Sequence, residues 1–154
     1  MVLSESELVE AVARDRAAGR TVAFANGCFD LLHVGHVRYL QAAAAEADRL
    51  IVAVNDDRSV AGLKGEGRPI LPASDRAELV AALRGVEYVV VFGDATVERL
   101  LLLIKPDVHC KGTDYTVETV PERAVVQAYG GRTVIVGDTK KHSTRDLLSR
   151  LSRG

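Results

Sequence analysis

The sequence predicts an open, doubly wound α/β fold, in which helices cover both faces of a five-stranded parallel sheet. Short apolar, β-branched runs alternate along the 154 residues with longer helical patterns, as they do in chains of βαβ units. The second run, RLIVAVN, is almost continuously apolar, which is typical of a parallel strand buried on both faces. Because no repeat or low-complexity linker interrupts this alternation, we expect residues 1–154 to form a single domain.

Each element is predicted from its own strand pattern, helix cap or glycine stop. Ser4 and Glu7 form a capping box for the first helix, which Gly19 ends, so residues 1–19 are expected to be an N-terminal helical extension. Ser74 is expected to cap a later helix. The strands are expected over 21–25, 49–55, 88–92, 107–111 and 133–136. The other helices are expected over 34–47, 74–83, 95–105, 122–129 and 142–151.

Composition restricts the classes of partner. Twenty basic residues face 21 acidic ones without a long run of either sign, which argues against binding to nucleic acid or to an anionic membrane. The N-terminus is too charged for a secretory signal, and no apolar run approaches the roughly 18 residues of a membrane span. We therefore expect a cytoplasmic protein that binds small molecules. Cys28 and Cys110 form no CxxC pair or disulfide framework, and we expect both to be reduced.

The segment NGCFDLLHVGH (26–36) follows the first predicted strand, where an open α/β sheet binds its ligands. Gly27 would let the backbone approach a ligand, and the next helix offers free N–H groups to an anion. His33 and His36 would leave one helix face about 4.5 Å apart along the axis. Gly35 leaves no side chain between them. The spacing predicts that both imidazoles reach one anionic target.

Other roles remain open for residues of this segment. Asp30 is placed equally well to cap the helix or to contact a ligand. Cys28, His33 and His36 could bind zinc, but neither CxxC nor HExxH is present, so we expect no protein-bound metal. Simple packing of the two histidines is a weaker explanation, because Gly35 costs about 1 kcal/mol of helix propensity.

The segment GCFDLLHVGH resembles the GxFDxxHxGH motif of the nucleotidyltransferase superfamily that contains glycerol-3-phosphate cytidylyltransferase and pantetheine-phosphate adenylyltransferase. The matching positions are Gly27, Phe29, Asp30, His33, Gly35 and His36. This resemblance implies a Rossmann-like domain in which a substrate phosphate attacks the α-phosphorus of a nucleoside triphosphate, usually with Mg²⁺, and releases pyrophosphate. It also implies that the motif, with Cys28 inside it, contacts the nucleotide. The two histidines would donate to the charge that develops in the transition state.

Three further segments resemble the branch of this superfamily that makes ADP-heptose from ATP and D-glycero-β-D-manno-heptose 1-phosphate. They are VNDDRSVAGLKGEGRPI (54–70), PDVHCKGTDYTVETV (106–120) and YGGRTVIVGDTKKHST (129–144). In the bifunctional version of that enzyme a sugar kinase precedes this domain. The start at Met1 with one capped helix predicts the stand-alone form.

The same resemblance implies roles for residues after the later strands. Lys64 would reach the triphosphate with Arg68 as a second cation, although both could instead lie in a solvated loop. Substrate hydroxyls or magnesium-bound water would be oriented by Asn55, Asp56 and Asp57, for which a turn is an equal explanation. The family places nucleotide or substrate contacts at Lys111, Gly112, Asp114 and Tyr115. Its nucleotide clamp matches Ser143 and Thr144, of which Ser143 could simply be a helix cap.

One departure from the family pattern leaves the choice of nucleotide open. Lys141 and His142 precede the clamp serine where many relatives have glycine and a small residue, and Arg145 replaces a further hydroxyl. The alternative is therefore a cytidylyltransferase that acts on glycerol 3-phosphate or another small phosphate or phosphonate. A nucleotide-sensing module without turnover is a third reading, disfavoured by the intact motif and Lys64. A homodimer is compatible with the sequence.

Overall fold

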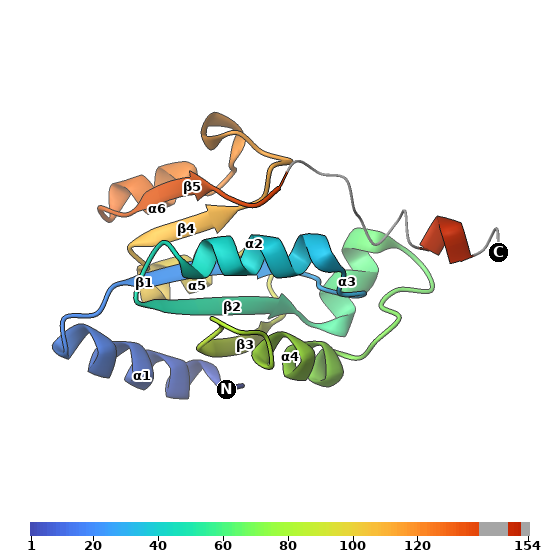
Figure 1. Cartoon of the computed structure of the whole chain (residues 1–154), viewed down its shortest axis with the longest axis horizontal. Helices are drawn as coiled ribbons and strands as arrows, with labels where there is room; N and C mark the ends of the chain where they lie inside the picture. Colours follow the sequence, from blue (N-terminus) through green and yellow to red (C-terminus); the bar gives the residue numbers. More distant parts are fainter. Residues whose placement is uncertain (139–147, 152–154) are drawn as a thin grey trace.

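Five apolar segments form one parallel sheet in the computed structural model, which describes residues 1–138 and 148–151 (Figure 1). The strand order β3-β2-β1-β4-β5 confirms the predicted doubly wound α/β fold. The winding reverses between β1 and β4, so the switch point at which such sheets bind ligands lies between these two strands. The strands are β1 (Val22–Gly27), β2 (Arg49–Asn55), β3 (Tyr88–Phe92), β4 (Val108–Lys111) and β5 (Arg132–Ile135).

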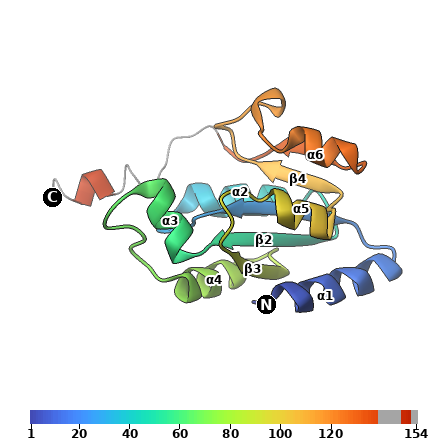
Figure 2. The same ribbon diagram turned by 180° about the vertical axis from the view of Figure 1, so that it is seen from behind.

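Side chains alternate along each strand between two apolar cores, one on each face of the sheet. Within β2, Ile51 and Ala53 belong to one core, and Val52 and Val54 belong to the other. Helices α1, α5 and α6 cover the first core, on the face that Figure 2 shows in front, and α2 and α4 cover the second. The helices are α1 (Glu5–Ala17), α2 (Val34–Ala44), α3 (Asp57–Lys64), α4 (Ala73–Ala81), α5 (Glu98–Ile104) and α6 (Arg123–Ala128).

The N-terminal segment protects an edge of the sheet. The predicted capping box is confirmed, because the Glu7 backbone N–H donates to Ser4 Oγ and the Ser4 N–H donates to the Glu7 carboxylate. Before this helix, Leu3 N–H donates to Val89 O at 2.8 Å, and Val89 N–H donates to Met1 O at 2.9 Å. Residues 1–3 thus pair with β3 and cover backbone groups that an exposed edge strand would offer to another chain.

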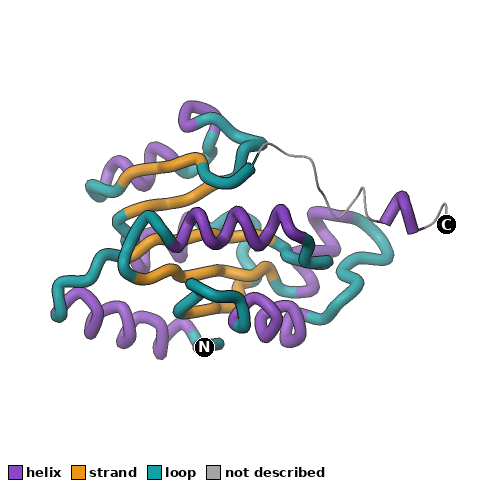
Figure 3. The backbone as a smooth tube through the Cα atoms, viewed as in Figure 1, coloured by secondary structure: helices purple, strands orange, loops and turns teal. Residues whose placement is uncertain are grey.

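The main difference from the predicted elements is α3, an eight-residue helix in a segment expected to be a turn and a loop. Asp56 caps it by accepting from Ser59 N–H at 2.8 Å. Val60 is its one buried residue, and a helix of this length is marginal unless tertiary contacts stabilise it. Figure 3 shows α3 and the loop after it beyond the carboxyl end of β2.

Several predicted boundaries were also wrong. Helix α2 ends at Ala44 rather than near 47, and α5 begins at Glu98 rather than 95. Ser74 does not cap α4, because that helix already begins at Ala73, whose N–H donates at 2.8 Å to the Asp57 carboxylate. Of the helix expected over 142–151, the structure describes residues 148–151, which are helical. No helix in the described part of the chain combines the length and apolar character that a bilayer crossing requires.

Candidate active site

The sites expected from the sequence gather at the carboxyl ends of β1, β2 and β4. These strands are adjacent in a parallel sheet, so the loops after them meet at one edge. The first loop and the start of α2 contain Gly27, Cys28, Phe29, Asp30, His33, Gly35 and His36. The positions at the end of β2 and after it are Asn55, Asp56, Asp57, Lys64 and Arg68, and those at the end of β4 and after it are Lys111, Gly112, Asp114 and Tyr115. Ser143 and Thr144 lie outside the described residues.

His33 and His36 lie side by side, but for a different reason from a shared helix face. His33 has extended backbone and is the N-cap of α2, whereas His36 is the third residue of the helix. Gly35 N–H donates to His33 Nδ1 at 3.1 Å, and His33 N–H donates to His36 Nδ1 at 3.2 Å. This reciprocal capping box brings the two ring centroids to 4.0 Å.

The capping box also determines which ring nitrogens carry protons. A backbone N–H can only donate, so Nδ1 of each imidazole must accept and cannot hold a proton. In the neutral rings the proton is therefore on Nε2, and both Nε2–H groups are donors. The segment His-Val-Gly-His (33–36) thus provides two Nε2–H donors in a fixed tautomer at the start of a helix. Such a pair of donors can stabilise a phosphoryl group that gains negative charge.

Phe29 forms a buried support for this pair rather than an exposed contact surface. Its side chain is 4% exposed, and its ring meets the His36 ring edge-on at 5.5 Å between centroids. The backbone φ of Phe29 is 50°, a left-handed value that costs energy for a bulky residue. A Cβ at Gly27 would lie 3.1 Å from the Phe29 ring, so this glycine makes room for the ring.

Asp30 does not cap α2, because His33 occupies that position. Its carboxylate, 2% exposed, instead accepts from the N–H groups of Ile70 and Leu71 and from Arg68 Nε at 2.6 Å. Burial alone would raise the pKa of Asp30, but these donors lower it below its usual value. Asp30 thereby anchors the loop after α3 to the loop after β1.

Arg68 and Lys64 bring positive charge to the same place. The Arg68 side chain is 15% exposed, which excludes the solvated-loop alternative for this residue, and its Nη2 is buried without a hydrogen-bond partner among the described residues. Lys64 is the exposed last residue of α3. Burial raises the pKa of the Cys28 thiol, and the charges of Lys64, Arg76 and Arg68 oppose that rise. The Cys28 thiol therefore lies in the electrostatic field of these three cations.

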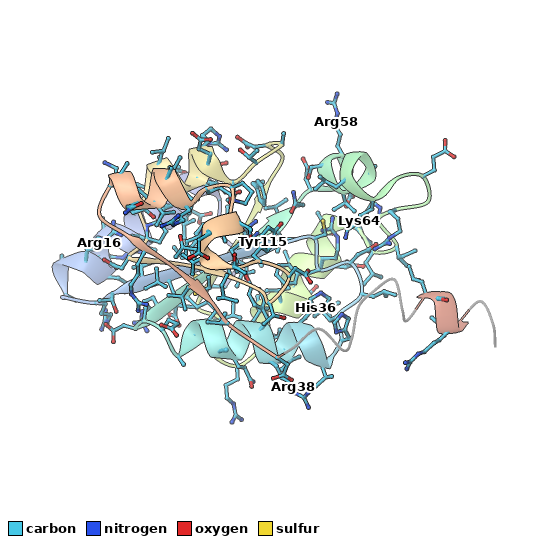
Figure 4. All side chains as sticks on the ribbon, turned by 90° about the horizontal axis from the view of Figure 1, so that it is seen from above. Arg16, His36, Arg38, Arg58, Lys64 and Tyr115 are labelled. Atoms are coloured by element: carbon cyan, nitrogen blue, oxygen red, sulfur yellow. The ribbon has the colours of Figure 1, made fainter. Side chains whose placement is uncertain are left out.

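Figure 4 shows how the labelled residues lie around this end of the sheet. Lys64 and His36 come from α3 and α2, and Tyr115 follows β4, whereas Arg16 lies toward the opposite end. Arg58, on the same helix as Lys64, points away from the body of the protein. The two cations of α3 therefore face different surroundings.

The carboxylates after β2 have structural partners that the sequence did not reveal. Asp56 caps α3, and Asp57 accepts from Arg76 Nη2 at 2.8 Å as well as from the N–H at the start of α4. Asn55 is 5% exposed, and its Nδ2 donates to Ser59 Oγ. The alternative role of Asp56 and Asp57 as turn residues is not observed, because Asp56 is the N-cap of α3 and Asp57 is its first residue. Their predicted contacts with substrate hydroxyls or magnesium-bound water remain predictions.

At the carboxyl end of β4, a partly buried cation lies over an aromatic ring. Lys111 Nζ is 4.7 Å from the centre of the Tyr115 ring. Burial lowers the pKa of Lys111, while the charges of Glu122 and Asp114 oppose this shift. Thr113 Oγ1 donates to Asp138 O at 2.7 Å, which ties this loop to the segment after β5. The predicted nucleotide contacts of this loop stay predictions.

Arg76 is a functional candidate that the sequence did not indicate. Its side chain is fully buried, and Nη1 donates at 2.7 Å to both Cys28 O and Asn55 O. Nε donates to Leu71 O at 2.9 Å. One guanidinium therefore holds the ends of β1 and β2 and the loop before α4 together. A single arginine in an amphipathic helix gives no signal of such a role, because its partners are distant in the sequence.

His109 and Asn26 form a second pair that was not expected. His109 is fully buried in β4, and burial, with a smaller effect of the Lys111 charge, lowers its pKa to about 3. Its Nε2 lies 3.1 Å from Asn26 Oδ1, an acceptor, so Nε2 carries the proton. The position of Asn26 in the NGCFD segment could have marked it as a site residue. The sequence around it does not indicate His109 as its partner, because the two residues are 83 positions apart.

Metal-binding side chains are not clustered in the described part of the site. Among the described residues, no three His, Cys, Asp or Glu side chains are grouped so that they could hold a metal ion. Cys28 Sγ is directed to Asn55 Oδ1 at 3.9 Å rather than to the histidines.

The chain is similar to known proteins over most of its length. A family model described as cytidylyltransferase-like matches residues 24–150. The bifunctional protein HldE of Ectopseudomonas mendocina is 47% identical over 150 residues, which cover 97% of this chain and 32% of that protein. The same protein of Pseudomonas entomophila is 45% identical over 152 residues, 99% of this chain and 32% of its own length. The chain thus spans about a third of these curated relatives.

A solved structure extends the likeness to the fold. The lipopolysaccharide core biosynthesis protein from Thermoplasma volcanium superposes with a TM-score of 0.68 at 26% sequence identity. The match covers 79% of this chain and all of that one.

Proposed function

Because the chain belongs to the cytidylyltransferase-like family, we propose that it is a nucleotidyltransferase that transfers AMP from ATP to a sugar 1-phosphate. The acceptor that we propose is D-glycero-β-D-manno-heptose 1-phosphate, and the products are ADP-heptose and pyrophosphate. The observation that carries the proposal is the pair of Nε2–H donors that the capping box of His33 and His36 fixes at the switch-point loop.

The heptose assignment has separate support. The segments LKGEGRPI, KGTDY and YGGRTVIVGD resemble the heptose branch of the superfamily, whereas the histidine motif serves every branch. The HldE relatives align with nearly the whole chain, and the solved neighbour is named a lipopolysaccharide core biosynthesis protein.

In the proposed reaction, a phosphate oxygen of the acceptor attacks the α-phosphorus of ATP. A new P–O bond forms, and the bond from the α-phosphorus to the bridging oxygen breaks with its electron pair on pyrophosphate. His33 and His36 donate Nε2–H hydrogen bonds to the phosphoryl oxygens as charge develops there. Lys64 and Arg68 balance the charge of the phosphates, and the orphaned Nη2 of Arg68 is a donor still in need of an acceptor.

We assign Mg²⁺ to the triphosphate rather than to a protein cage. Hard phosphate oxygens are ligands that Mg²⁺ prefers, and the described residues offer no group of carboxylates that could enclose it. When bound, the ion would neutralise part of the charge on the phosphates.

The proposal is tested with a panel of four nucleoside triphosphates against several phosphorylated acceptors, in the presence of Mg²⁺. Pyrophosphate release and product mass are the readouts. We expect the fastest reaction with ATP and the heptose 1-phosphate, because a site built for several hydroxyls discriminates against a shorter acceptor. A clear preference for CTP with glycerol 3-phosphate would favour the cytidylyltransferase, which the unusual KKHSTR segment keeps as the alternative. Absence of pyrophosphate with every pair would contradict both.

A further inference from the structure

The ladder between β1 and β4 stops early at the switch point. These strands pair only at Ala23 with Val108 and at Phe24 with His109. On its other side, β1 pairs with β2 as far as Gly27, and β4 pairs with β5 as far as Lys111. Both strands therefore continue as regular strands after they have separated from each other.

The hydroxyl group of Tyr39 lies where the next rung of that ladder would be. In a parallel ladder continued from the pair Phe24 and His109, the next bond would run from Asn26 N–H to Cys110 O. Instead, the Tyr39 hydroxyl donates to Cys110 O at 2.7 Å, and the Asn26 backbone N–H lies close enough to the same hydroxyl to lower its pKa. One side-chain oxygen thus lies between the two backbone groups that would otherwise form the next rung.

The surroundings hold Tyr39 in this position. It lies on α2 three residues after His36, about one helical turn further on. Gly137 has a φ of 96°, and a Cβ there would lie 3.3 Å from Tyr39 Cα, so the segment after β5 packs directly against this residue. A Cβ at Gly112 would lie 4.0 Å from the tyrosine ring. Burial raises the pKa of Tyr39, which keeps the hydroxyl protonated and able to donate.

Asn26 is held from a second direction as well. Its side-chain Oδ1 accepts from His109 Nε2 at 3.1 Å, while its backbone N–H is near enough to the Tyr39 hydroxyl to lower the pKa of that hydroxyl. The residue before Gly27 is therefore fixed by groups from α2 and from β4, so the start of the histidine motif loop depends on both.

We propose that Tyr39 is a positioning residue whose hydroxyl acts as an inserted rung, which holds β1 and β4 apart so that the nucleoside triphosphate binds between the loops after these strands. The nature of the ligand rests on the proposed function, whereas the inserted rung rests on the Tyr39–Cys110 hydrogen bond and on the end of the ladder between β1 and β4. Without the hydroxyl, Asn26 N–H and Cys110 O either bond directly, which closes the separation, or stay unpaired.

The test compares Tyr39→Phe with Tyr129→Phe. Tyr129 is a matched control because its hydroxyl also donates to a backbone carbonyl, Pro106 O at 2.8 Å, but precedes β5 at the other end of the sheet. For Tyr39→Phe we expect the KM for ATP to rise about tenfold, with kcat and the KM for the acceptor within about threefold of wild type. The control should leave all three within about twofold.

Two measurements do not need turnover. Titration calorimetry with ATP alone should show the same weakening, about tenfold, in Tyr39→Phe but not in Tyr129→Phe. Backbone amide exchange, followed residue by residue by NMR, should change at Asn26 in Tyr39→Phe and not in the control. The phenyl ring retains the apolar packing, so both variants should keep the wild-type circular dichroism spectrum.

The outcomes separate this inference from the proposed function. Equal ATP affinity in wild type and Tyr39→Phe, or unchanged exchange of the Asn26 amide, would overturn the inference. A wild-type protein that binds ATP but releases no pyrophosphate with any acceptor would contradict the proposed function alone. A wild-type protein that binds no nucleoside triphosphate would overturn both.

Discussion

At the scale of single residues, His33 has one observed role and one proposed role, and one substitution would remove both. It caps α2 through Nδ1, and it offers Nε2–H to the proposed transition state. Asparagine is a good N-cap but is too short to place a donor where Nε2 lies. We expect His33→Asn and His33→Ala each to lower turnover at least about a hundredfold. Only His33→Ala should lose about 1 kcal/mol in free energy of unfolding, measured with urea. Near-normal turnover of folded His33→Asn would refute the assignment.

Lys64 and Arg58 offer a comparison within one helix. Lys64 influences Cys28 in the site, whereas Arg58 points away from the protein body (Figure 4). We expect Lys64→Ala to raise the KM for ATP about tenfold, because a charge-assisted contact to phosphate is lost. Arg58→Ala should leave it within about twofold. Identical steady-state kinetics for the two variants would show that Lys64 is a solvated surface residue that does not contact phosphate.

His109 makes stability depend on pH in a defined direction. Its pKa is about 3 in the folded protein against an ordinary value of 6.5, so protons bind preferentially to the unfolded chain. The free energy of unfolding should therefore fall as the pH drops from about 6.5 toward 3, by about 2 kcal/mol between pH 7 and 5. His109→Gln keeps an N–H donor but cannot titrate. Urea unfolding at pH 7 and pH 5 measures how much free energy of unfolding each protein loses between the two pH values. This loss should be about 2 kcal/mol smaller in His109→Gln than in wild type. Equal losses would exclude His109 as the cause.

At the scale of elements, Arg76 fastens α4 to the ends of β1 and β2. Its guanidinium donates to three backbone carbonyls and to Asp57, which also holds the N-terminus of α4. Lysine keeps the charge but cannot reach these acceptors at once. We expect Arg76→Lys to lower the free energy of unfolding by about 3 kcal/mol, measured by urea denaturation. Arg99→Lys, at an exposed pair with Glu5, should cost less than about 1 kcal/mol. Similar losses of free energy of unfolding in both variants would show that Arg76 does not link these elements.

At the scale of the whole molecule, the site depends on loops from three strands that share one edge, and the metal is expected to arrive with the nucleotide. EDTA should abolish pyrophosphate release, and Mg²⁺ should restore it, because the triphosphate oxygens require a hard cation. Zinc added without nucleotide should leave the melting temperature unchanged. Stoichiometric zinc in carefully purified protein, lost in His33→Asn, would instead establish a protein metal site.

The sequence by itself determined the strands of the sheet and the end of the sheet at which the candidate site residues gather. Strands such as β2 and β3 have the predicted bounds, because runs of apolar β-branched residues encode strands locally. The spacing of His33 and His36 determined that two imidazoles meet, since both ends of their capping box lie within one turn.

Tertiary structure alone decided how that site is supported. Asp30 anchors a loop 38 to 41 positions away, Arg76 reaches a carbonyl 48 positions away, and Tyr39 meets one 71 positions away. The short helix α3 likewise depends on its surroundings, because a helix of eight residues is marginally stable by itself. Local propensities and spacings act over a few residues, whereas these contacts exist only after the parallel strands have brought distant loops to the same edge of the sheet.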